Sequence, residues 1–184
     1  WAATSPAATY LTQAEALAQA FPDAQIERQG YVLTDAQMKQ AADLAGKPLP
    51  SALATAYVAT RDGAVVGTAY FDIHRVHSLS ETLMIVVNPN GTAADVVVLA
   101  FSEPPKYCAP EAWLKQFLSL KLDNRLNLKQ DIQGISGATL TARATTWFLR
   151  SRRLSEALQP TIERLQPAVS ALAARLAPEA QASE

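Results

Sequence analysis

Residues 55–102 read TAYVATRDGAVVGTAYFDIHRVHSLSETLMIVVNPNGTAADVVVLAFS, and this stretch decides the fold. Its segments are rich in Val, Ile, Tyr and Thr, residues that favour β-strands. Turn sequences separate them, first Arg61-Asp62-Gly63 and later Asn88-Pro89-Asn90-Gly91. The predicted strands cover residues 55–60, 64–76, 81–88 and 94–102. Because such short connections join neighbouring strands antiparallel, we predict an antiparallel β-meander.

Helices are predicted before and after this meander in the sequence. Thr12 lies three residues before Glu15, which is the spacing of a capping box, and Pro22 ends the helix that Thr12 begins. The remaining predicted elements are a strand over residues 25–33 and helices over residues 34–44, 112–120 and 141–158. The fold class is therefore α+β, an antiparallel sheet packed by helices.

The chain is expected to form one main domain with a tail. Its 184 residues are close to the size of a single domain. We assign this domain to residues 1–158, with its motif-bearing core at 50–150. Residues 159–184 form the tail, in which Pro160 and Pro167 prevent one continuous helix.

Composition excludes several classes of function. Sixteen basic and seventeen acidic residues leave a formal charge of -1 without a basic stripe, so no nucleic-acid partner is expected. The apolar runs are too short to cross a bilayer. One Cys and two His exclude an internal disulfide framework and a His-rich or four-Cys metal cluster, and no metal site is predicted.

The segment Ser136-Gly137-Ala138-Thr139-Leu140-Thr141 is the most informative for chemistry. It is a turn of small residues that enters a helix, with hydroxyls placed where the free N–H groups of the helix point. One interpretation is an ordinary helix N-cap, since Ser and Thr are preferred caps. The other is a phosphate site, because the positive end of the helix dipole attracts anions.

With its two preceding residues, Gly134 and Ile135, this segment resembles the flavinylation motif of the covalent FMN-binding domain family. The family includes the FMN-carrying components of the sodium-translocating NADH:quinone oxidoreductase and of the Rnf electron-transport complex. There, a flavin transferase joins the FMN phosphate to a threonine through a phosphoester. The resemblance implies that Thr139 is the acceptor and that Thr141 is a phosphate or backbone partner and the alternative acceptor. It also implies cofactor contacts from Ser136, Gly137, Ala138 and Leu140.

A second stretch extends the resemblance. Phe101-Ser102-Glu103-Pro104, followed by aromatic residues and Trp113, is similar to the Glu-Thr-Pro segment of the family. By this analogy Glu103, Pro104 and Tyr107 line the isoalloxazine ring. The chain departs from the family at Gln133, where an Asp usually precedes the first Gly of the motif.

The resemblance implies an extracytoplasmic or periplasmic electron-transfer flavoprotein, with membrane association through a partner. Covalent FMN would relay electrons to or from a membrane redox complex or another carrier, after maturation by a flavin transferase. Flavin supplies one- and two-electron chemistry that side chains lack, so no catalytic side chain is assigned. Two alternatives remain, namely a non-redox structural or sensory module of the same fold and a flavin-dependent reductase.

Other reactive residues are expected to be incidental. Cys108 has no second Cys to pair with, so it is interpreted as a buried or incidental thiol. His74 and His77 are three apart in a strand-like stretch, a spacing that favours opposite faces over shared metal ligation. We predict both as polar residues of the surface or of a pocket rim. Glu81 is expected to be solvated unless it contacts the flavin or a partner.

Overall fold

The computed structural model describes residues 8–46, 48–120, 126, 128 and 132–151. The chain before the meander contains a short strand, β1 (Ala8–Thr9), and helix α1 (Gln13–Ala20). Strand β2 (Gln25–Val32) and helix α2 (Asp35–Ala45) follow. Both helices begin with a capping box, at Thr12 and at Thr34, which confirms the predicted starts.

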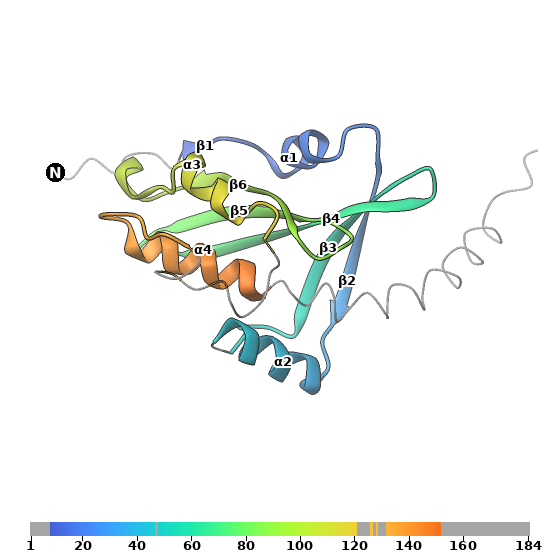
Figure 1. Cartoon of the computed structure of the whole chain (residues 1–184), viewed down its shortest axis with the longest axis horizontal. Coiled ribbons are helices and arrows are strands. Elements are labelled where there is room, and N and C mark those ends of the chain that lie inside the picture. The colour runs from blue at the N-terminus through green and yellow to red at the C-terminus, as the bar shows by residue number, and fades with distance from the viewer. Residues whose placement is uncertain (1–7, 47, 121–125, 127, 129–131, 152–184) are drawn as a thin grey trace, which may run out of the picture. The chain divides into compact units, whose positions relative to one another are not determined.

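The predicted meander is present as four consecutive strands. They are β3 (Leu53–Arg61), β4 (Ala64–Arg75), β5 (Ser80–Val87) and β6 (Ala93–Phe101). Within the described residues, β1 and β2 add the outer strands and give the order β1-β6-β5-β4-β3-β2 (Figure 1). Every pairing between these strands is antiparallel, which confirms the α+β class.

Successive side chains of a strand point to opposite faces of the sheet, so they pack against different helices. Leu83, Ile85 and Val87 of β5 share a core with the segments after the meander. The segments that join this core are helix α3 (Glu111–Leu114), the 3₁₀ turn η2 (Lys115–Phe117) and helix α4 (Thr139–Ser151). A short 3₁₀ turn, η1 (Pro105–Tyr107), precedes them and has no buried residue. Met84 and Val86 point the other way and pack with Leu17 and Phe21 of the α1 region.

The helix predicted over residues 112–120 is shorter than expected. It ends in η2 at Phe117, and the next residues return to the sheet. The N–H of Ser119 donates to the carbonyl of Ala93, and the N–H of Ala93 donates to the carbonyl of Leu120. Ser119 has a φ of +64°, which lies outside the helical region, so these two hydrogen bonds replace the last helical turn.

Two predictions at the C-terminus are tested only in part. Helix α4 begins at Thr139, two residues before the predicted start, and is described to Ser151. The remainder of the predicted helix and the tail over residues 159–184 lie outside the described residues. Among the described helices, none has both the length and the hydropathy needed to cross a membrane.

Candidate flavin site

The Ser136–Thr139 segment forms a tight turn that delivers the chain into α4. Gly137 adopts a left-handed conformation with φ of +78°, which favours glycine because it has no Cβ. The N–H of Ala138 donates to the carbonyl of Ile135 at 3.2 Å, and Thr139 is the first residue of the helix. The first turn of α4 therefore presents N–H groups that lack partners within the helix, as an anion site requires.

A pocket of about 320 Å³ lies at this helix start. Three segments that are distant in the sequence form its wall: the turn after β4, the chain from Glu103 to the 3₁₀ turn η1, and the start of α4 with the turn before it. The lining residues are Val76, His77, Glu103, Tyr107, Gly137, Ala138, Thr139, Leu140 and Thr141. The volume lies within the range of about 300–1,000 Å³ that is usual for cofactor sites.

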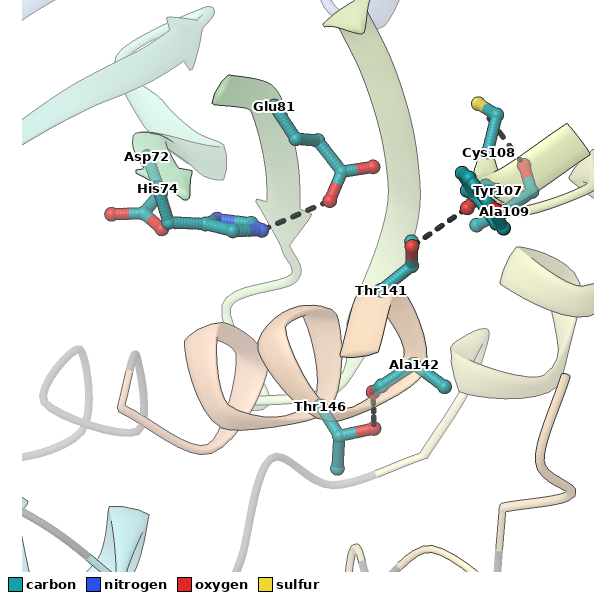
Figure 2. Close-up of polar contacts among 9 residues, drawn as sticks. All are labelled: Asp72, His74, Glu81, Tyr107, Cys108, Ala109, Thr141, Ala142 and Thr146. Atoms are coloured by element: carbon teal, nitrogen blue, oxygen red, sulfur yellow. Dashed lines mark hydrogen bonds and ion pairs between the residues drawn. The ribbon is translucent and has the colours of Figure 1, made fainter. Parts of the chain in front are cut away.

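The two candidate acceptor threonines have different environments. Thr139 is exposed and lines the pocket. Thr141 has an exposed fraction of 0 %, and its hydroxyl donates to the backbone carbonyl of Tyr107 at 2.6 Å (Figure 2). Thr141 therefore joins the first turn of α4 to η1 across the pocket, whereas the hydroxyl of Thr139 is accessible.

Glu103 lines the pocket, but its carboxylate is already engaged. Oε1 accepts the backbone N–H groups of Ser78 and Leu79, both at 2.6 Å. These hydrogen bonds, first that from Leu79 and then that from Ser78, lower the pKa of Glu103 below its usual value. Glu103 thus fixes the turn between β4 and β5, which carries Val76 and His77 into the pocket wall.

Most of the remaining predicted contacts also lie at the pocket. Tyr107 and Leu140 are exposed by 36 % and 43 %, so apolar surface is available to a planar ring. Ser136 is exposed in the turn before Ala138, and Pro104 is exposed at the start of η1; neither is among the described residues that line the pocket. His77 is exposed at the pocket, in agreement with its predicted place on a rim.

The expectation that Glu81 is solvated is wrong, and His74, predicted at the surface or a pocket rim, is largely buried beside it. In the pairing of β4 with β5, His74 lies opposite Glu81. Both side chains are on the face of the sheet that packs against α4. The His74 ring contacts Asp72 through Nδ1 at 2.8 Å and Glu81 through Nε2 at 2.9 Å (Figure 2). Although burial alone lowers the pKa of His74, the hydrogen bonds and charges of Asp72 and Glu81 raise it to about 9. The alternation of Asp72 and His74 could have indicated a shared face, but their pairing with Glu81 depends on the register of the hairpin.

Two residues beside the site, Cys108 and Trp113, have environments that suit a structural role. Burial and then the charge of Glu81 raise the pKa of the Cys108 thiol, which keeps it protonated and unreactive at neutral pH. The indole of Trp113 is buried and donates to the carbonyl of Gln133 at 2.5 Å, so Trp113 belongs to the core. No group of three or more His, Cys, Asp or Glu among the described residues is arranged to hold a metal ion.

The comparisons with known proteins agree with this geometry. Residues 79–150 match the sequence model of the FMN-binding domain family. This part of the chain is therefore similar to FMN-binding domains. Its fold is similar to that in the crystal structure of NqrC from Shewanella oneidensis, with a TM-score of 0.53 and 17 % sequence identity. That similarity covers 85 % of this chain and 91 % of the NqrC chain. No curated protein sequence matches significantly.

The residues at the start of α4 suit the FMN-binding domain. A phosphate group can lie at the N-terminal N–H groups of a 13-residue helix, where the helix dipole favours negative charge. A Cβ placed on Gly137 would meet nothing within 4 Å, so the approach to this turn is open. Tyr107 and Leu140 would contact the ring, and the ring system would supply the redox chemistry.

Proposed function

We propose that this protein is an extracytoplasmic electron carrier that holds FMN through a phosphoester bond to Thr139. The observation that carries the proposal is the exposed hydroxyl-bearing residue at the first position of α4, within the Ser136-Gly-Ala-Thr139 motif and facing the pocket. The similarity to NqrC, with the family match at residues 79–150, supports a redox role beside a membrane complex.

Attachment would use residues whose positions are fixed by the fold. In the step catalysed by a flavin transferase, the Thr139 oxygen would attack the FMN phosphorus of a phosphoanhydride donor such as flavin adenine dinucleotide. The phosphoanhydride P–O bond breaks, AMP leaves with the bonding electrons, and the hydroxyl proton passes to a base of the transferase. The N–H groups of the α4 terminus then stabilise the negative phosphate. Thr141, with its hydroxyl donated to the carbonyl of Tyr107, keeps the two walls of the pocket together and leaves Thr139 as the accessible acceptor.

Covalent attachment matters most for a carrier that works away from a supply of free FMN. A phosphoester prevents loss of the cofactor by dissociation, so a relay between a membrane redox complex and another carrier keeps its flavin. The domain itself binds and orients the ring and influences its reduction potential. Gln133, in place of the usual acidic residue, would slow recognition by a generic transferase.

The test is production of the protein with and without a flavin transferase, followed by denaturation. The wild-type chain should stay yellow when unfolded, and peptide mass spectrometry should place the adduct on Thr139. Thr139→Val should release all flavin on denaturation. Thr139→Ser, which retains a hydroxyl, is the matched control and should retain some adduct.

An adduct on Thr141, or covalent flavin in Thr139→Val, would refute the assignment. Flavin that is bound but always released by denaturation would support a noncovalent module.

A further inference from the structure

A charged cluster of Asp72, His74 and Glu81 lies on one face of the sheet; Glu81 is fully buried, whereas the side chains of His74 and Asp72 are exposed by 12 % and 16 %. The side chain of Glu81 has an exposed fraction of 0 %, and its Oε1 atom has no hydrogen-bond partner among the described residues. Its other oxygen, Oε2, contacts Nε2 of His74, while Asp72 contacts Nδ1 on the opposite side of the ring. The imidazole is therefore held in line between two carboxylates, an arrangement that costs desolvation and calls for a reason beyond packing.

Three stretches of the chain connect this cluster to the pocket wall. His74 precedes the pocket residue Val76 by two positions, and the strand partner of Glu81 is Phe101, two positions before the pocket residue Glu103. The charge of Glu81 also reaches the thiol of Cys108, which is adjacent to the pocket residue Tyr107. Strand β4, strand β6 and the chain after η1 thus each connect the cluster to the pocket.

The cluster places charges of both signs in a weakly screened environment. Two carboxylates flank one imidazolium, and the titratable groups that face Glu81 are His74 from β4 and the thiol of Cys108, which in turn contacts the phenol of Tyr10. From α4, the buried residues near its first turns, Thr141 and Thr145, are uncharged. Buried charges act over longer distances than solvated ones because screening is weak. The charge of each member can therefore reach the pocket.

We propose that the Asp72–His74–Glu81 cluster sets the reduction potential of the flavin held in the neighbouring pocket, with Glu81 lowering the potential and His74 raising it. This inference rests on the proposed function, which puts the flavin in that pocket. Reduction adds negative charge to the flavin, so a nearby carboxylate opposes it and a nearby imidazolium favours it. Glu81 and His74 are then residues that act on the flavin through the electric field, without contacting it.

The experiment compares midpoint potentials of the FMN-loaded protein at pH 7, measured by stepwise reduction with dithionite while an electrode records the solution potential and absorbance records the flavin. Glu81→Gln removes one negative charge with little change in shape and should shift the potential upward. His74→Gln removes the positive charge and should shift it downward. Glu27→Gln, an exposed residue on the outer strand β2, is the matched control and should leave the potential unchanged.

A pH series gives a second, independent readout. The pKa of His74 is about 9, so its positive charge is lost as the pH rises through that value. The wild-type potential should therefore fall more steeply between pH 8 and 10 than that of His74→Gln. Flavin titrates in both proteins, and the comparison removes its contribution.

The outcomes separate this inference from the proposed function. A chain that retains no FMN overturns both. Retained FMN with equal potentials in wild type, Glu81→Gln and Glu27→Gln overturns the inference alone, even if Glu81→Gln lowers the melting temperature. If Glu81→Gln does not fold, Asp72→Asn takes its place, and an upward shift is again expected; no shift would overturn the inference.

Discussion

Thr139 and Thr141 are two residues apart, yet Thr139 is exposed to the pocket and Thr141 is buried in the pocket wall. The Thr141 hydroxyl is buried and donates to a backbone carbonyl that would otherwise need another partner. Thr141→Val keeps the side-chain shape but removes this donor, so the free energy of unfolding should fall by about 1–2 kcal/mol. Chemical denaturation measures this loss. Mass spectrometry of the loaded variant should still find the adduct on Thr139, and loss of all adduct would show that Thr141 takes part in attachment.

The protonated state of His74 should make stability depend on pH. Its pKa in the folded chain, about 9, exceeds the value near 6.5 expected when unfolded, so the folded state holds the proton more tightly. The resulting stabilisation, on the order of 2 kcal/mol, is fully present below pH 6.5 and is lost as the pH rises through 9. The difference in unfolding free energy between wild type and His74→Gln should therefore shrink from pH 6 to pH 10. His77→Gln, an exposed control, should show no such trend. A difference that does not vary with pH would contradict the assigned pKa.

At the level of elements, the contact between α1 and the sheet depends on a glycine in β4. A Cβ on Gly67 would lie 2.8 Å from the Phe21 ring and 3.3 Å from the Val87 carbonyl oxygen. Gly67→Ala should lower the free energy of unfolding by about 1–3 kcal/mol because it forces the end of α1 away from the sheet. Gly30→Ala in β2 is the matched control, since nothing lies within 4 Å of its Cβ position. Equal melting temperatures for the two variants would show that Phe21 moves aside without cost.

The elements that the sequence predicted well are those with local signals. The turn at Arg61-Asp62-Gly63, the capping box at Thr12 and the helix start at Thr34 are specified within a few residues, and the structure confirms them. The helix after the meander was predicted too long because its end depends on hydrogen bonds to Ala93, about 25 residues earlier in the chain. Local propensity does not report such distant pairing.

For the candidate site, too, the features with local sequence signals were predicted and those that depend on distant pairing were not. The motif at Ser136–Thr141 was visible in the sequence because turn, helix start and hydroxyls are adjacent in the chain. The engagement of Glu103 with the turn at Ser78 and Leu79, and the pairing of His74 with Glu81, were not visible. Both require the register of β4, β5 and β6, which a single sequence does not fix when the turn is irregular.

At the scale of the whole molecule, the candidate flavin site is confined to one part of the chain. Every described residue that lines the pocket lies between Val76 and Thr141, and the described residues of the two cores lie between Leu11 and Leu149. We propose that residues 1–158 suffice for flavin attachment and that residues 159–184 serve another purpose, such as contact with the redox partner. In the sequence, Ile162, Leu165, Val169, Leu172 and Leu176 recur at intervals of three or four, the pattern of an amphipathic surface.

Truncation after Leu158 tests this assignment of functions to the two parts of the chain. Flavin content and melting temperature should match those of the full chain, because the truncation removes none of the described residues that line the pocket or form the two cores. Electron transfer with the redox partner should slow if the amphipathic residues form the docking surface, since their apolar area is then buried only in the complex. A variant with Leu165 and Leu172 both changed to Ser in the full chain is the matched control and should reproduce the slower transfer. A large fall in melting temperature on truncation would instead assign these residues to the folded domain itself.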